Sequence, residues 1–180
     1  IMLYVFVFSV LRFMTGLCMG PVVSSILTAS LCLLLGLAML APVVRAKRSQ
    51  DITDISRALS SESWQKRVGA LKTVIEKKLD IGDLPAYSRM LSSPRVPERY
   101  WLARALGRSR RPGTYQDLLS LWDDRSRNVV CMVYEGLGLR GQRSAVKQII
   151  ERLKKSEDWY IQGYAYNALR RLGWKQKKLK

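Results

Sequence analysis

The sequence has no histidine and only three cysteines among its 180 residues. Histidine is the usual general base in enzymes and the most common ligand of metals. The cysteines, Cys18, Cys32 and Cys131, form no CxxC pair, so the sequence supports neither a zinc site nor a disulfide framework. We expect the three thiols to act as small hydrophobic side chains in a reducing compartment. No metal ion and no cofactor are expected.

Other signals of catalysis are also lacking. The sequence contains no P-loop and no GxGxxG motif, and its serines and threonines have no histidine to activate them. Adjacent acids occur at Asp123-Asp124 and at Glu157-Asp158, but both pairs precede predicted helices, where helix capping accounts for them. The sequence therefore predicts a protein that is not an enzyme, and it identifies no small-molecule substrate.

Charge is almost absent from the first 44 residues, which contain Arg12 but no other Lys, Arg, Asp or Glu residue. The run from Val22 to Val44 would span about 34 Å as a helix, enough to cross a bilayer core of about 30 Å. It is followed by Arg45, Lys47 and Arg48, and such a cluster prefers the cytoplasmic face of a membrane. This pattern predicts a transmembrane helix.

The residues before that run, Ile1 to Met19, are also apolar, and Gly20-Pro21 separates the two stretches. Since Pro21 suits a helix start better than a helix interior, we expect a transmembrane hairpin over residues 1–44, with Arg12 near its turn as an intramembrane polar group. A signal peptide is one alternative, although its apolar region would be shorter, and a hairpin in a soluble core is another. Because the sequence begins at Ile1, we expect part of the natural N-terminus to precede it.

The rest of the chain carries 30 of the 31 Lys and Arg residues and all 14 Asp and Glu residues, a net charge of +16. Such a surplus predicts an anionic partner, either lipid headgroups, nucleic acid or an acidic protein surface. Solvated charge on exposed helix faces is the alternative explanation.

A repeat of 31 to 35 residues runs through this basic region. Its anchor is a small residue followed by leucine, at Ala70-Leu71, Ala105-Leu106, Gly136-Leu137 and Ala168-Leu169. The small residue predicts close approach of a neighbouring helix, and the glycines that follow (Gly107, Gly138 and Gly173) predict left-handed helix caps.

Shorter apolar helices are expected between the anchor helices, over residues 84–91, 114–122 and 144–153, where apolar positions recur at helical spacing. A helix at about residues 53–59 is expected to cap the repeats. No segment alternates with period two for long enough to predict a strand. The fold class is therefore all-α, with an N-terminal transmembrane helical hairpin followed by a short α-solenoid.

The third copy carries the motif most fully, with Asp123-Asp124, Val129-Val130 and Gly136-Leu137-Gly138 in that order. Because these motifs follow one another in this order, the region from about residue 62 to residue 173 resembles the HEAT-like repeats of the phycocyanobilin-lyase type. The resemblance implies stacked helix pairs, although Asn128 follows Arg127 where Val-Arg is usual. A lyase activity is not expected, because no residues that would carry that chemistry can be identified here.

Stacked repeats would align equivalent turns on one edge and form a basic ridge, predicted to bind a partner. Its members are Arg104, Arg108, Arg110, Arg111, Arg140 and Arg143. A second basic set is predicted to meet the membrane surface: Arg45, Lys47, Arg48, Lys175, Lys177 and Lys178. Nucleic acid is a less favoured ligand, since the helical spacing of the five tryptophans indicates core packing rather than base stacking.

The domains expected are a hairpin (1–44), a basic juxtamembrane linker with a capping helix (45–61), HEAT-like repeats (62–174) and a basic tail (175–180). The function expected is that of a scaffold or accessory subunit of a complex of membrane proteins. It would be a multi-pass protein of the inner (plasma) membrane, and its repeats would dock a partner on the cytoplasmic face. The alternative is a peripheral module that binds anionic lipid or nucleic acid.

Overall fold

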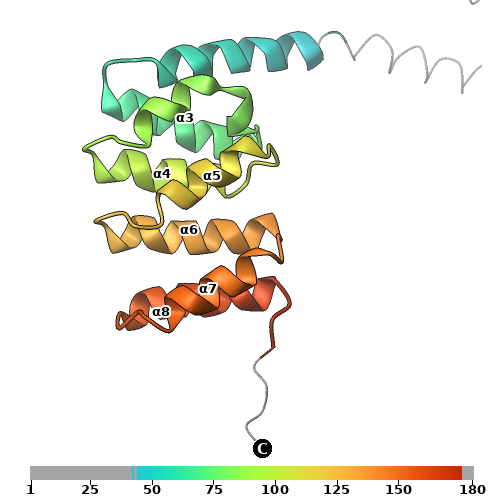
Figure 1. Cartoon of the computed structure of the whole chain (residues 1–180). Coiled ribbons are helices and arrows are strands. Elements are labelled where there is room, and N and C mark those ends of the chain that lie inside the picture. Colours follow the sequence, from blue (N-terminus) through green and yellow to red (C-terminus); the bar gives the residue numbers. More distant parts are fainter. Residues whose placement is uncertain (1–41, 43, 176–180) are drawn as a thin grey trace, which may run out of the picture. The chain divides into compact units, whose positions relative to one another are not determined.

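The computed structural model describes residue 42 and residues 44–175, and every regular element within them is a helix. The chain divides into two units, residues 1–51 and 52–180. The second unit carries the repeats as two layers of stacked helices (Figure 1). The all-α prediction is therefore confirmed for the described part of the chain.

The first layer consists of four longer helices, which lie side by side and run in the same direction (Figure 1). They are α3 (Trp64–Glu76), α4 (Val96–Leu106), α6 (Arg127–Arg140) and α8 (Trp159–Arg171). Each contains one of the predicted anchor pairs. Proline suits a helix start because its missing N–H has no acceptor there, and Pro97 lies in the first turn of α4.

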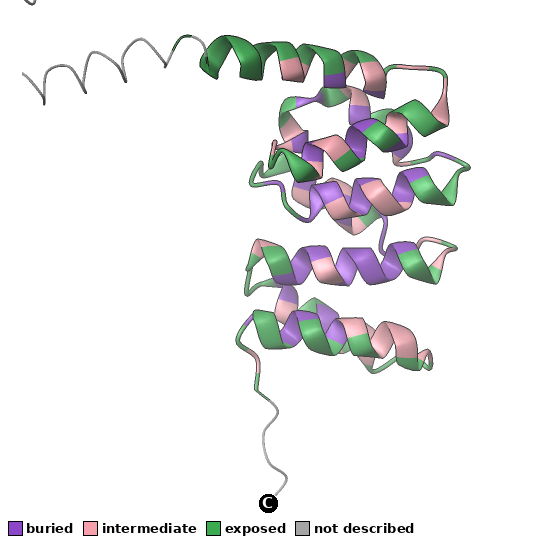
Figure 2. Cartoon of the chain, turned by 180° about the vertical axis from the view of Figure 1, so that it is seen from behind, coloured by how far each residue is buried: buried purple, intermediate pink, exposed green. Residues whose placement is uncertain are grey.

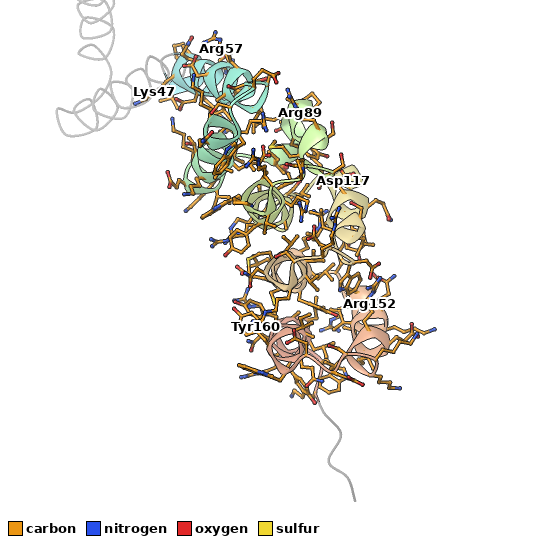
Figure 3. All side chains as sticks on the ribbon, turned by 90° about the vertical axis from the view of Figure 1, so that its left-hand side faces the viewer. Lys47, Arg57, Arg89, Asp117, Arg152 and Tyr160 are labelled. Atoms are coloured by element: carbon orange, nitrogen blue, oxygen red, sulfur yellow. The ribbon has the colours of Figure 1, made fainter. Side chains whose placement is uncertain are left out.

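The second layer consists of the shorter helices that connect them. They are η1 (Ile81–Asp83), η2 (Pro85–Met90), α5 (Gly113–Ser120) and α7 (Ala145–Leu153). The predictions for 114–122 and 144–153 agree with α5 and α7. The helix predicted over 84–91 is instead a 3₁₀ helix, a form that suits short connecting segments. Figure 3 looks along the helices and places Arg89, Asp117 and Arg152 in this layer, across from Tyr160 in the other.

The core is one cluster of buried side chains contributed by both layers, and Figure 2 shows the buried residues along the stacked helices. Leu71, Leu102, Leu106, Leu137 and Leu169 of the first layer are fully inaccessible to solvent. Leu118 of α5 and Ile149 of α7 are equally buried and close the core from the second layer. Because neither helix of a pair can bury its apolar side alone, neighbouring repeats must stack.

Small residues let the long helices approach each other closely, as the anchor pattern predicts. A β-carbon on Gly136 would lie 2.9 Å from the α-carbon of Gly107, and one on Gly138 would lie 3.0 Å from that of Ala168. No side chain larger than hydrogen fits at these positions without moving the adjacent helix. The prediction that Gly107 is a left-handed cap was wrong, since its φ is −61°. Gly138 lies inside α6.

Left-handed caps do occur at two other glycines. Gly141 ends α6 with a φ of 71°, and Gly173 follows α8 with a φ of 79°. The second of these was predicted. Glycine is favoured at both because other residues have a steric cost at positive φ.

A helix over residues 44–59 precedes the repeats, so the predicted capping helix at about 53–59 is the end of a longer element. Its residues Ile55 and Leu59 belong to the core of the second unit. Arg45, Lys47 and Arg48 are exposed on the same helix. No helix in the described part of the chain is long and apolar enough to cross a membrane. The predicted hairpin and Arg12 fall outside the described residues, apart from the hairpin's last residues.

Candidate functional site

The two edges of the helix stack differ in charge. At the edge where the long helices begin, arginines pair with acids of the next repeat, and we call this the mixed edge. Arg67 Nε donates to Glu98 Oε1 at 2.5 Å, and Arg99 Nε donates to Asp124 Oδ2 at 2.5 Å. Because each pair joins consecutive repeats, the mixed edge fixes how the repeats stack.

Glu98 is the most buried of these acids, with no exposed surface. Burial alone would raise its pKa, but hydrogen bonds from Arg67 and from Ser93 Oγ, the latter at 2.5 Å, outweigh that effect and lower it. Glu98 therefore stays ionised inside the protein.

At the other edge, where the long helices end, basic residues are in excess. We call this the basic edge, and its members are Arg108, Arg110, Arg111, Arg140, Arg143, Arg170, Arg171 and Lys175. The acids that pair with it include Glu135 of α6, whose carboxylate lies 3.8 Å from the guanidinium of Arg108. Asp83 accepts from Arg111 Nε at 2.9 Å, and Asp80 accepts from the backbone N–H of Arg110 at 2.9 Å.

Three members of the basic edge line one hollow. Arg108, Arg110 and Arg140 surround a cavity of about 470 Å³, whose apolar wall is Leu139. The hollow lies where the turn after α4 meets the end of α6. The structure thus brings these predicted ridge residues together, as the alignment of equivalent turns implied.

Arg140 is held in this hollow by oxygen atoms of the preceding repeat. It donates to the carbonyl of Leu106 at 2.9 Å, to Thr114 Oγ1 at 3.0 Å and to the carbonyl of Arg111 at 3.0 Å. Its guanidinium also lies 5.4 Å from the ring centroid of Tyr115. Burial lowers the pKa of Arg140 from its ordinary value. None of these hydrogen-bond partners is a carboxylate, although the charge of Asp80 acts on Arg140 electrostatically without bonding to it.

The other predicted ridge residues occupy different places. Arg143 lines a separate hollow with Trp174. Arg104 does not join the edge, because its guanidinium lies 4.8 Å from the ring centroid of Trp101 on the long-helix face. Lys72 of α3 lies over the same ring at 4.9 Å. Of the predicted membrane-surface set, Lys175 is exposed, and Lys177 and Lys178 lie outside the described residues.

The tryptophans do not all lie in the core as predicted. Trp122 is buried, but Trp159 is 77% exposed. Cys131 is buried in α6, where desolvation raises the pKa of its thiol to about 11. The thiol is therefore protonated at neutral pH, which agrees with the hydrophobic role predicted for it. Cys18 and Cys32 fall outside the described residues.

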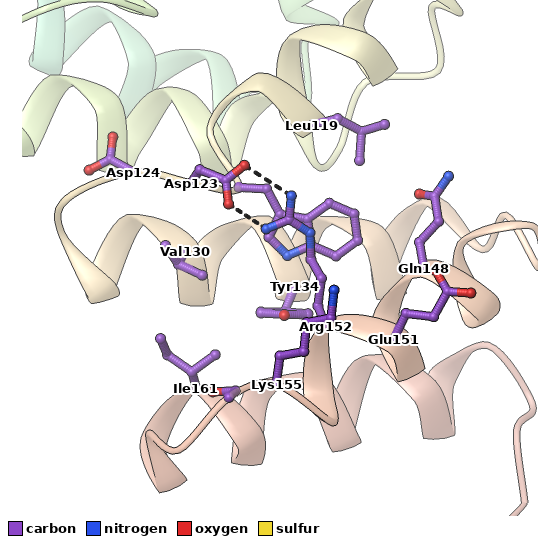
Figure 4. A pocket seen from close by; sticks show the side chains of 12 residues that line it. Leu119, Asp123, Asp124, Val130, Tyr134, Gln148, Glu151, Arg152, Lys155 and Ile161 are labelled. Carbon is purple, nitrogen blue, oxygen red and sulfur yellow. Dashed lines mark hydrogen bonds and ion pairs between the residues drawn. The ribbon is translucent and has the colours of Figure 1, made fainter.

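Sequence reasoning missed a groove of about 810 Å³ between α5 and α7 (Figure 4). Arg152 covers its aromatic floor, with its guanidinium 4.6 Å from the ring centroid of Trp122. Asp123 accepts from both terminal nitrogens of Arg152, at 2.5 and 2.9 Å. Asp123 was assigned to helix capping, which was wrong. The usable signal in the sequence was the position of Arg152, which follows Asp123 by 29 residues, an interval close to the length of one repeat.

Of the two acids before α8, Asp158 fits the capping prediction. Asp158 accepts from the backbone N–H groups of Tyr160 and Ile161, at 2.8 and 3.3 Å, and so caps that helix. Asp124 instead joins the mixed edge and accepts from the backbone N–H of Ser126 at 2.8 Å.

Two stacked layers of helix pairs related by a repeat of 31 to 35 residues define an α-solenoid. A model of HEAT repeats matches residues 84–173, which is half of the chain. The protein therefore belongs to the HEAT repeat family. No curated protein matches the sequence. The first long helix, α3, precedes the matched region but packs against α4 in the same layer.

Proposed function

We propose that the protein is a membrane-anchored HEAT-repeat scaffold, an accessory subunit that docks a partner protein within a complex of membrane proteins. The observation that carries the proposal is the basic edge. Several of its arginines have no acid within ion-pair distance among the described residues, whereas Arg67, Arg99 and Arg127 of the mixed edge each form a salt bridge with an acid of the next repeat. HEAT repeats suggest a scaffold for protein–protein interaction, and an uncompensated charged surface on such a scaffold suggests where a partner sits.

The membrane anchor in this proposal rests on the sequence of residues 1–44, which is apolar except for Arg12. The cytoplasmic placement of the repeats rests on Arg45, Lys47 and Arg48, following the preference of such clusters for that face. Anionic lipid headgroups near these residues would add to the anchoring by about 1 kcal/mol for each basic side chain. The proposal includes no catalytic step.

Two fractionation experiments on the full chain test the proposal. Membranes that contain the protein are first washed at alkaline pH, and an anchored chain stays in the pellet while a peripheral one is released. The pellet is then solubilised in mild detergent at low salt, and the mass of the species is measured. The proposal expects a complex with at least one other subunit in fixed stoichiometry. A lone monomer would contradict the scaffold, and release by the wash would contradict the anchor.

The unpaired arginines also fit a second function, a peripheral module that binds anionic lipid or nucleic acid. Binding of that kind weakens steeply with salt because counterions are released from the ligand. Titrations with phosphatidylserine vesicles and with single-stranded RNA, each at low and high salt, test it. Binding that does not change with salt would exclude this second function.

A further inference from the structure

We propose that the basic edge recognises an extended acidic segment of a partner protein, with carboxylates at every third residue. The inference rests on the proposed function and names the chemistry of the partner. The segment would run along the stack of long helices and cross the turns after α4, after α6 and after α8. Each turn would receive one carboxylate.

The charge on this edge exceeds what the fold requires. Cations in the last turn of a helix offset the helix dipole, which accounts for Arg170 and Arg171. It does not account for Arg110 and Arg143, which lie in the turns beyond their helices. Both are exposed, and their side chains have no acid within 4.0 Å in the described part of the chain. These two arginines are therefore available to a partner.

The hollow beside Arg110 is prepared to receive a carboxylate. A guanidinium has five N–H donors, and the bonds to Leu106, Thr114 and Arg111 use three of those of Arg140. The two remaining donors have no acceptor among the residues that the structure describes. Since the three bonds already fix the orientation of Arg140, binding an anion would cost little side-chain entropy. Leu139, 43% exposed, offers an apolar contact in the same hollow.

The spacing of the turns suits a polyproline II segment. Stacked helices lie about 8–10 Å apart, so the turns after α4, α6 and α8 recur at about that distance. A polyproline II chain rises about 3.1 Å per residue with three residues per turn, so every third side chain points the same way, about 9 Å apart. A β-strand alternates its faces with period two and cannot present every third residue on one side. Acidic residues at positions i, i+3 and i+6 therefore match the edge.

Other anionic partners fit less well. Sequence-tolerant binding of single-stranded nucleic acid uses exposed aromatic rings as stacking platforms. Here Arg140 already covers Tyr115, and Trp174 packs edge-on against Tyr166. A membrane surface favours apolar groups that insert between headgroups, but Trp159, the most exposed large apolar side chain described, begins α8 at the opposite edge. An acidic peptide is the partner that these residues favour.

Two fluorescent nonapeptides of equal composition provide the test. One repeats Glu-Pro-Pro three times, and the other places its three glutamates together before six prolines. Each is titrated by fluorescence anisotropy against the full chain, held in nanodiscs of zwitterionic lipid at low salt. The periodic peptide is expected to bind about tenfold more tightly or better, a difference of about 1.4 kcal/mol. Equal affinities would overturn the proposed spacing.

A double variant and a single-site control locate the binding surface. The double variant Arg110→Glu with Arg143→Glu reverses two exposed charges of the basic edge and is expected to weaken binding about tenfold or more. Arg125→Glu reverses an exposed charge on the mixed edge and is expected to leave binding unchanged. Thermal unfolding of both variants verifies the fold. Equal effects of the double variant and of Arg125→Glu would overturn the assignment to the basic edge.

Competition separates the alternatives. A single-stranded RNA or phosphatidylserine vesicles that displace the periodic peptide at lower concentration than the unlabelled peptide would favour those ligands and overturn the proposal.

The result of the peptide titrations is independent of the fractionation experiment that tests the scaffold. If the native complex persists while both peptides fail, the carboxylate recognition is wrong and the scaffold stands. If the periodic peptide binds but no complex is found, the scaffold is wrong.

Discussion

Gly107 and Gly136 stack α4 directly against α6, since a β-carbon on Gly107 would overlap the α-carbon of Gly136. The contact is between backbones, so no side-chain rotation can relieve it. Leu118 of the second layer packs over the same point, with its methyl groups 3.1 and 3.3 Å from a β-carbon built on Gly136. This glycine pair sets the distance between the second and third long helices.

Gly107→Ala is therefore expected to destabilise the repeats, by about 2 kcal/mol or more, because overpacking forces two helices apart. All five tryptophans lie between residues 64 and 174, so urea unfolding followed by tryptophan fluorescence reports on the repeats. Gly163→Ala is the control, because nothing lies within 4 Å of a β-carbon there and the residue sits inside α8. It is expected to stabilise by about 0.5–1 kcal/mol. Equal effects of the two substitutions would contradict the close approach.

Glu98→Gln tests the buried ion pair of the mixed edge. The substitution leaves the guanidinium of Arg67, whose side chain is 13% exposed, without its carboxylate. Losing one partner of a buried pair costs about 3–5 kcal/mol, and glutamine, which can still accept a hydrogen bond, should be near the lower value. Glu62→Gln is the control, since its side chain is 95% exposed and its pair with Arg89 is long, at 3.5 Å. We expect less than about 0.5 kcal/mol for that control.

Stability is expected to fall in acid. Burial opposes ionisation of Asp80, Glu98 and Asp124, but hydrogen bonds to each carboxylate outweigh it and lower the pKa. A lowered pKa in the folded state means that, as the pH falls, the unfolded chain binds protons first. The ionised carboxylates therefore contribute their full stabilisation to the fold above the unfolded pKa values of about 4. It is lost as the pH falls through the folded-state values. Urea unfolding midpoints measured between neutral pH and about pH 3 test this dependence.

The same titration applied to Glu98→Gln assigns part of the loss to one residue. Glutamine does not titrate, so the stability gap between the unaltered protein and the variant should narrow as the pH falls. A gap that stays constant down to pH 3 would show that Glu98 is not the titrating group.

Gly141→Ala tests the left-handed end of α6. Its φ of 71° is strained for alanine even though a β-carbon there would meet nothing within 4 Å. The expected cost is about 1 kcal/mol, from conformation alone. Gly69→Ala in α3 is the matched control, because that glycine also has open space but lies within a helix. A stabilising effect at Gly141 would contradict the cap.

Much of this fold could be predicted because its determinants are local. The anchor pairs mark the long helices, and the small residue in each explains the close approach seen at Gly136. Gly107 shows the limit of this reasoning. A glycine after a helix is equally suited to a left-handed cap and to a tight contact, and only the neighbouring helix decides between them.

The partners of charged residues were harder to predict, because they depend on the register between repeats. Arg152 reaches Asp123 and covers Trp122, although the sequence suggested only a helix cap at that aspartate. The interval between opposite charges, 31 residues for Arg67 and Glu98, is close to the repeat length and was the usable signal. The basic edge was easier to predict, since equivalent turns of a solenoid must align.

The most direct test of the scaffold is purification of the full chain, with and without Arg110→Glu and Arg143→Glu, from the membrane fraction in which we propose that it resides. These two samples and the control Arg125→Glu are solubilised in the same mild detergent, and the subunits in each are quantified by mass spectrometry. The account predicts a partner subunit in fixed ratio with the unaltered protein and with Arg125→Glu, and its loss from the double variant. An unaltered protein that purifies alone, or a partner retained equally by all three, would contradict it.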